Sequence, residues 1–179
     1  FVEKASKNGI DVFRTFDALN DFSNIELTIK EVKKNGKHAQ GAMAYTVSPV
    51  HTLSSWLDLA KQIEDAGADS VAIKDMAGLL KPNAAFELVS ELKQNISVPI
   101  HMQTHATTGF STATNMKAIE AGIDNIDTSI SSMSMTYGHT ATETIVSMFD
   151  DTKIFSAIDK NLFPELSSHF KKIRKKYEL

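Results

Sequence analysis

Three segments of this sequence share one pattern, in which a glycine and an aspartate precede a short apolar run. They cover residues 9–13, 67–71 and 122–126. A glycine at that place is typical of a helix end that leads into a strand. Two further strand candidates lie between them, at residues 39–45 and 98–103. The five candidates begin at intervals of roughly 30 residues, which is typical of repeated βα units.

Helical patterns fill the segments between these strands. Apolar residues recur with the helical period over residues 56–63 and 85–92. Residues 23–35 carry a weaker apolar stripe, and Gly122 ends a short candidate helix over residues 112–121. The pattern therefore predicts an α/β protein.

The domain organisation follows from the absence of breaks in this series. No linker or low-complexity segment interrupts it, so we expect one domain over residues 1–149. Residues 150–179 differ and form the start of a C-terminal helical extension. Its apolar residues fall at helical spacing, and lysines and an arginine fill the other face. We interpret this face as solvated; a surface for an acidic partner is the alternative.

Five βα units fit either a doubly wound sheet or part of an eight-stranded barrel. No glycine-rich phosphate fingerprint follows any of the strands, which weakens the dinucleotide-binding alternative. A complete barrel has eight units and takes about 250 residues, whereas this chain has 179. A barrel of this kind would lack about three strands. The first residue, Phe1 rather than Met, also leads us to expect a fragment.

Composition excludes several classes of function. The formal net charge is -3, which gives no reason to expect attraction to nucleic acid through net charge. The chain has no cysteine, so disulfides, thiolate metal sites and a cysteine nucleophile are excluded. No apolar stretch approaches the roughly 20 residues that span a bilayer.

Lys74 lies where the third predicted strand ends. The apolar residues 71–73 suit a buried parallel strand, and Pro82 is well placed to begin a helix over residues 83–95. Parallel α/β folds place their chemistry at this end of their strands. Lys74 either forms a salt bridge, for example with Asp17 or Asp75, or reaches solvent, or has a chemical role. The chemical roles are a Schiff base and, after carbamylation, a metal ligand.

Two histidines and an amide follow on the fourth predicted strand. Alternation along an extended segment directs His101, Gln103 and His105 to one side. Imidazole nitrogens and an amide oxygen can hold a divalent cation. The alternative is that His101 packs or forms a hydrogen bond, so that His105 alone is functional.

Four segments closely resemble the carboxyltransferase domain of biotin-dependent enzymes. Among its members, the oxaloacetate decarboxylase alpha subunit is the most similar, followed by the pyruvate carboxylase domain and the transcarboxylase subunit. The similarity covers nearly the whole chain. The four segments are FRTFDALND at 13–21, IKDMAGLLKP at 73–82, HATTG at 105–109 and KAIEAGIDNIDTSISSMSMTY at 117–137.

The resemblance implies a TIM barrel of which this chain holds about strands four to eight. In that family a divalent metal of the Zn, Mn or Co type is held by an aspartate, a carbamylated lysine and two histidines. Lys74 matches the lysine and His105 matches one histidine, but Gln103 stands where the other histidine is expected. The aspartate lies outside this sequence. Lys74, His105 and, with this departure, Gln103 are therefore the expected metal-site residues, with Lys74 as a ligand rather than a base.

The implied reaction moves a carboxyl group between oxaloacetate and biotin, giving pyruvate and carboxybiotin. Biotin would arrive on a carboxyl carrier domain that this chain does not contain, so we expect the fragment to be inactive alone. Asp17 and Thr46 project toward the same face and are candidates for the keto-acid pocket, with structural roles as the alternative. The resemblance implies a cytoplasmic homo-oligomer without nucleic-acid partners, or one attached to membrane decarboxylase subunits.

Three functional hypotheses remain open on the sequence. The first is an oxaloacetate decarboxylase alpha-subunit fragment, favoured by the amino-acid sequence of residues 106–109 and 132–136. The second is the carboxyltransferase part of pyruvate carboxylase. The third is a non-catalytic assembly module that lost its metal, as Gln103 suggests.

Overall fold

A computed structural model of the chain describes residues 1–155 and 157–177. Its centre is a parallel five-stranded sheet in which the spatial order follows the chain, β1-β2-β3-β4-β5. An order that never reverses has no switch point of the kind found in doubly wound sheets. The strands are β1 (Val12–Phe16), β2 (His38–Ala44), β3 (Ser70–Asp75), β4 (Ile100–Thr104) and β5 (Asn125–Ile126).

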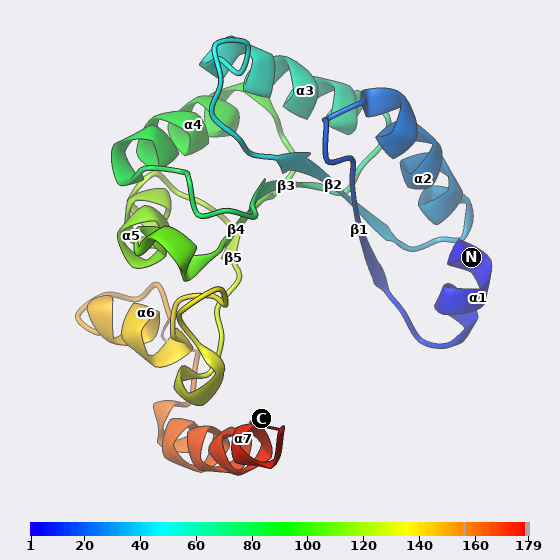
Figure 1. Cartoon of the computed structure of the whole chain (residues 1–179). Helices are drawn as coiled ribbons and strands as arrows, with labels where there is room; N and C mark the ends of the chain where they lie inside the picture. The colour runs from blue at the N-terminus through cyan, green and yellow to red at the C-terminus, as the bar shows by residue number, and fades with distance from the viewer. Residues whose placement is uncertain (156, 178–179) are drawn as a thin grey trace.

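Helices cover one face of this sheet and follow one another in an arc, with the strands as the inner layer (Figure 1). Thr52 and Ser55 form a capping box at the start of α3, and Pro82 is the first residue of α4. These covering helices are α2 (Phe22–Lys34), α3 (Leu53–Asp65), α4 (Pro82–Asn95) and α5 (Ser111–Glu120).

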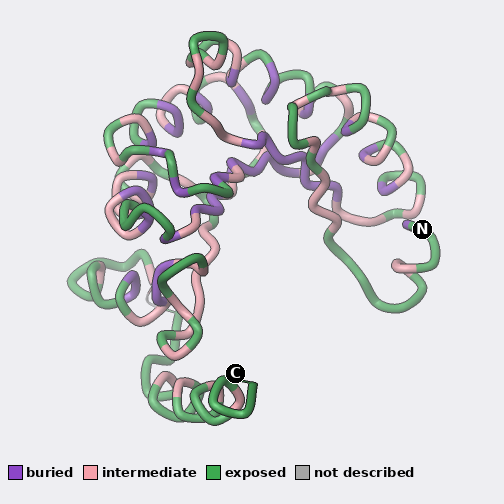
Figure 2. Tube along the Cα trace, viewed as in Figure 1, coloured by how far each residue is buried: buried purple, intermediate pink, exposed green. Residues whose placement is uncertain are grey.

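The hydrophobic core lies between the helices and the outer face of the strands, where Figure 2 shows most of the buried residues. Ile25, Ile63 and Val89 from the helices are fully buried there, as are Val71 and Ile73 from β3. A β carbon added to Gly41 on β2 would lie 2.3 Å from Ile63 Cγ2. The backbone of β2 therefore approaches α3 so closely that only glycine fits.

The glycine and aspartate pattern has a structural cause in two of its three copies. Asp69 accepts a hydrogen bond from the Ala39 amide of the preceding strand, and Asp124 accepts one from the Ile100 amide, each at 2.8 Å. Each aspartate also pairs with a lysine near the end of the helix that leads into that previous strand, Lys33 of α2 or Lys93 of α4. One carboxylate thus joins the end of a helix to the start of the previous strand.

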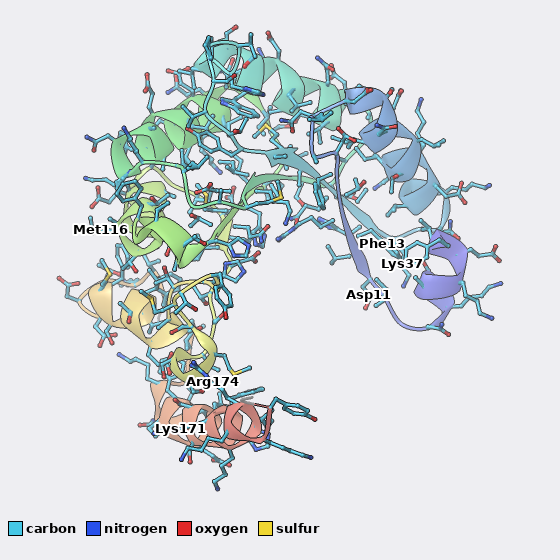
Figure 3. The ribbon with its side chains drawn as sticks, in the orientation of Figure 1. Asp11, Phe13, Lys37, Met116, Lys171 and Arg174 are labelled. Atoms are coloured by element: carbon cyan, nitrogen blue, oxygen red, sulfur yellow. The ribbon has the colours of Figure 1, made fainter. Side chains whose placement is uncertain are left out.

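The third copy departs from that arrangement. Asp11 pairs with Lys37, whose Nζ lies 2.7 Å from Asp11 Oδ1, just before β1 and β2 begin (Figure 3). A short helix, α1 (Val2–Lys7), precedes it, and Val2 is buried against the core.

The C-terminal part consists of short elements and one longer helix. They are η2 (Ser131–Met133), α6 (Thr142–Met148), η3 (Lys160–Leu162) and α7 (Phe163–Tyr177). A one-turn helix, η1 (Ala106–Thr108), also follows β4. α7 lies against η2 and has no buried residue (Figure 2). None of the described helices is both long and apolar enough to cross a membrane.

The predicted α/β class, the five strands and the four covering helices are confirmed. The basic helix predicted in the C-terminal part is observed as α7. The last strand is shorter than predicted, because only two residues pair with β4. α1 and α6 were not predicted; each spans seven residues or fewer, too short for a clear periodic pattern.

Candidate functional site

The inner face of the sheet, away from the helices, carries polar side chains in place of a hydrophobic core. Side chains alternate along a strand, so the residues that flank the core-facing ones point inward. In the strand register, Lys74 on β3 lies beside Gln103 on β4, and Arg14 on β1 lies beside Gln40 on β2. These inward residues form two groups.

The first group is a chain of hydrogen bonds at the C-terminal ends of β3 and β4. Lys74 Nζ donates to Gln103 Oε1 at 2.9 Å, and Gln103 Nε2 lies 3.2 Å from His105 Nε2. His105 Nδ1 lies 2.6 Å from the carbonyl oxygen of Tyr137. A carbonyl only accepts, so Nδ1 carries the ring proton and Nε2 accepts from the Gln103 amide. The donor and the acceptor in each of these three hydrogen bonds are therefore fixed.

Lys74 lies in a partly desolvated position at one end of this series of hydrogen bonds. Its ammonium is 4.8 Å from the centre of the Phe16 ring. Burial lowers the pKa of Lys74 below its ordinary value, the nearby Arg14 charge lowers it further, and Asp127 acts in the opposite direction. Lys74 therefore loses its proton to become a neutral amine more readily than a fully solvated lysine does.

The second group crosses the inner face from the first strand to the last. Arg14 Nη1 donates to Asp127 Oδ2 at 2.7 Å, and His101 Nε2 lies 2.5 Å from Asp127 Oδ1. Arg14 Nε also donates to Gln40 Oε1, and Gln40 Nε2 donates to Ser70 Oγ. All five strands thus contribute to one polar network or adjoin it.

Asp127 is the anionic centre of this second group. Burial raises the pKa of its carboxyl, but hydrogen bonds and charge from His101 and Arg14 outweigh burial and hold the pKa well below 3.8. The carboxylate is ionised at neutral pH and balances the Arg14 charge.

The structure places the two histidines of the fourth predicted strand in different groups. His101 and Gln103 both point to the inner face, as alternation requires, but His101 binds Asp127 whereas Gln103 binds Lys74 and His105. The alternative in which His101 forms a hydrogen bond describes what is observed.

The aspartates considered as partners of Lys74 have other roles. Asp75 is fully buried on the outer face, where it accepts hydrogen bonds from the Leu79 and Leu80 amides and from Thr104 Oγ1. Asp17 accepts from the Leu19 and Asp21 amides within its own loop. Within the described residues Lys74 forms no ion pair.

The two predicted pocket residues lie in the loops after β1 and β2. Asp17 lies at the C-terminal end of the sheet. Hydrogen bonds from the Asp21 and Leu19 amides hold the pKa of its carboxyl below its ordinary value. Thr46 follows β2 and is half-buried. Their role toward a substrate stays a prediction.

Sequence reasoning assigned no role to Arg14, Asp127 or His139. Arg14 and Asp127 stand at predicted strand ends, which is a signal for a site, but their pairing depends on how strongly the sheet curves. His139 lies in the loop after β5, and its ring centre is 4.7 Å from that of His105. No periodicity or spacing points to this contact.

The donor set near Lys74 is small. No group of three or more His, Asp or Glu side chains that could hold a metal lies within residues 1–155 and 157–177. Lys74, Gln103 and His105 nevertheless present an amine, an amide and an imidazole in one connected row. With Lys74 as a carbamate this row offers oxygen and nitrogen donors of the kind that divalent metals bind.

Curated relatives match the whole chain but extend well beyond it. It is 48% identical over 179 residues to one of the pyruvate carboxylase subunits of Methanocaldococcus jannaschii. It is 47% identical over 180 residues to the methylmalonyl-CoA carboxyltransferase 5S subunit of Propionibacterium freudenreichii. The chain spans 32% and 36% of these relatives, about a third of their length.

Solved structures agree with the sequence relatives. The carboxyl transferase domain of Rhizobium etli pyruvate carboxylase with pyruvate superimposes with a TM-score of 0.95 at 34% identity, over 98% of this chain and 30% of that one. The resemblance to carboxyltransferase domains is confirmed by these matches. The model of the HMGL-like family matches residues 4–169, and the chain therefore belongs to the HMGL-like family.

Proposed function

We propose that this chain is part of a biotin-dependent carboxyltransferase of the pyruvate carboxylase and transcarboxylase type. The observation that carries the proposal is the row of Lys74, Gln103 and His105 at the C-terminal ends of β3 and β4. This is the end of the strands at which parallel α/β barrels place their active sites. The similarity to carboxyl transferase domains, including one with pyruvate, supports pyruvate or oxaloacetate as substrate.

We assign the chain to the pyruvate carboxylase type rather than to the oxaloacetate decarboxylase type. The relatives at 48% and 47% identity belong to a pyruvate carboxylase and a transcarboxylase, so they support the second hypothesis from the sequence better than the first. Carriage of the carboxyl group by biotin on a separate carrier domain is common to both. These two relatives do not support an attachment to membrane decarboxylase subunits.

We place the five strands as strands four to eight of an eight-stranded barrel. Their sequential parallel order is that of a barrel, and the match covers less than a third of the solved domain. The two edge strands, β1 and β5, would then pair with strands outside this sequence.

Lys74 would act as a metal ligand after carbamylation. Its neutral amine, favoured by partial burial, would attack the carbon of CO₂. An N–C bond forms while one C=O π bond of CO₂ opens onto its oxygen, and the nitrogen loses a proton to solvent water to give the carbamate. A divalent metal, when bound, supplies Lewis-acid polarisation of a keto oxygen.

Gln103 can act as a metal ligand in only one of the two orientations of its side-chain amide. An ammonium donates, so the amide now turns Oε1 to Lys74 and its NH₂ to His105. A carbamate accepts, so the amide would rotate by half a turn, donate to the carbamate and direct Oε1 to the side of His105 Nε2. His105 and Gln103 would then offer one nitrogen and one oxygen to the metal.

Exchange of a carboxyl group between labelled pyruvate and oxaloacetate in the presence of free biotin tests the proposal on the full protein. Lys74→Ala should lower the rate by about a hundredfold or more, as loss of a metal ligand does. Lys30→Ala is the control, because Lys30 is exposed and, among the described residues, forms its ion pair with Glu26 of the same helix. A full rate in Lys74→Ala would contradict the assigned role.

A non-catalytic assembly module is the second candidate, and Gln103 is the observation that favours it. Metal analysis and the intact mass of the full protein separate the two. Absence of a bound divalent ion together with an unmodified Lys74 would support the module and overturn the enzyme.

A further inference from the structure

The loop between β5 and α6 is attached to three consecutive residues at the end of β4. The Ala106 amide donates to the Gly138 carbonyl at 2.8 Å, and His105 Nδ1 donates to the Tyr137 carbonyl at 2.6 Å. His139 Nδ1 donates to the Thr104 carbonyl at 3.1 Å. The loop therefore contacts the residue on either side of His105 as well as its ring.

This loop is also closed on itself by an unusual backbone. Met135 and Thr136 have φ angles of 65° and 55°, a left-handed conformation that is uncommon for residues other than glycine. The Met135 amide donates to the His139 carbonyl, and the Gly138 amide donates to the Met135 carbonyl, each at 2.8 Å. A strained pair of residues persists only where surrounding contacts hold it. The carbonyl of Tyr137 is thus held in place rather than free to turn away.

The side chain of His139 adds a ring contact to these backbone hydrogen bonds. Its ring lies against the ring of His105, with 4.7 Å between ring centres and 42° between planes. Its own Nδ1 is fixed by the Thr104 carbonyl. The ring of His105 cannot rotate without losing the Tyr137 hydrogen bond and this packing contact together.

We propose that His139 is a positioning residue that, with the Tyr137 carbonyl, holds His105 as the neutral Nδ1–H tautomer. The Nε2 lone pair is then directed toward Gln103, where a divalent transition-metal ion would bind. Outer partners of this kind, which fix the tautomer of a ligating histidine, typically change metal affinity by about 10- to 100-fold when removed. The inference rests on the proposed role of His105, but not on which keto acid the protein uses.

Nitrogen NMR of the full protein with ¹⁵N-labelled histidine tests this, with His105 signals assigned by their absence in His105→Asn. The unsubstituted protein should show a protonated Nδ1 and an unprotonated Nε2 at His105. His139→Ala should give a mixture of tautomers and bind Co²⁺ about tenfold more weakly. His139→Gln keeps a side-chain N–H for the Thr104 carbonyl but not the ring, and should recover part of both properties.

Tyr137→Ala is the matched control for the NMR measurement. Tyr137 is 83% exposed and accepts the His105 hydrogen bond through its backbone carbonyl, which alanine keeps, so the tautomer should not change. If His139→Ala fails to fold, Gly138→Ala replaces it, because a β carbon there would lie 3.1 Å from the Met135 carbonyl oxygen and shift the loop beside His139 by a few tenths of an ångström. It should give the same mixture.

An unchanged His105 tautomer in a folded His139→Ala or Gly138→Ala protein overturns the proposal, as does an Nε2–H tautomer in the unsubstituted protein. The outcome is distinct from that of the exchange assay. A protein that shows the expected tautomers but no carboxyl exchange contradicts the proposed function and leaves the role of His139 standing.

Discussion

Arg14 and Asp127 join the first and last strands of the sheet, with 2.7 Å between Arg14 Nη1 and Asp127 Oδ2. The sheet order places three other strands between them. A direct contact across the inner face therefore requires a strongly curved sheet, as in a barrel.

Asp127→Asn should lower the free energy of unfolding by about 2 kcal/mol, because the substitution removes charge-assisted hydrogen bonds at a mostly buried site. Urea unfolding of the full protein measures it. The control is Glu26→Gln, which removes an exposed pair within one helix and should change stability by less than about 0.5 kcal/mol. Equal effects of the two substitutions would contradict the importance of the Asp127 network.

The contribution of Asp127 should depend on pH in a defined direction. Its pKa in the folded protein lies below the ordinary value of 3.8. The stabilisation is therefore complete above about pH 4 to 5 and is lost as the pH falls toward the folded pKa. Urea unfolding at pH 7 and near pH 3 should show that the stability difference between the unsubstituted protein and Asp127→Asn shrinks in acid. A constant difference would contradict the lowered pKa.

Gly78→Ala tests how closely the loop after β3 approaches His105. A β carbon at Gly78 would lie 2.5 Å from the carbonyl oxygen of His105, and φ is 68°. Gly36 is a matched control, since its φ is 66° and nothing lies within 4 Å of an added β carbon. Gly36→Ala should cost about 1 kcal/mol from the left-handed backbone alone.

For Gly78→Ala we expect a further cost of about 1–3 kcal/mol from the close contact with backbone. Thermal or urea unfolding gives both values. Similar costs at the two glycines would mean that the loop after β3 moves freely away from His105.

Gly41→Ala should destabilise the protein by about 2 kcal/mol, because its β carbon would overlap Ile63 Cγ2 in the core. Ile63→Ala removes that atom and by itself leaves a cavity that costs about 2–5 kcal/mol. When Gly41→Ala is added to Ile63→Ala, the extra cost should largely disappear. Additive costs in this double-mutant cycle would show that β2 and α3 are not in direct contact.

Gln103→His should strengthen the binding of Zn²⁺ or Co²⁺ by the full protein, because imidazole is a better ligand than an amide for these ions. Calorimetric titration would show it as an increase of about tenfold or more in affinity. His101→Gln is the control, because His101 belongs to the Asp127 group and should leave the affinity unchanged. Unchanged affinity in Gln103→His would mean that residue 103 does not face the metal.

The sequence by itself determined the succession of strands and helices. The helical stripes, the glycine and aspartate pattern and Pro82 act through neighbouring backbone, so their effect is visible locally. It also placed Lys74, Gln103 and His105 at the ends of β3 and β4, because alternation along a strand fixes the face of each side chain.

Only the tertiary structure decided which of these side chains meet. The curvature of the sheet brings Asp127 to Arg14, and Asp127 binds His101, which therefore does not join the row of Lys74. The loop after β5 brings His139 to His105 through two left-handed residues that no sequence pattern indicates. These contacts join residues far apart in the chain, and the packing of the whole sheet and its loops sets their distances.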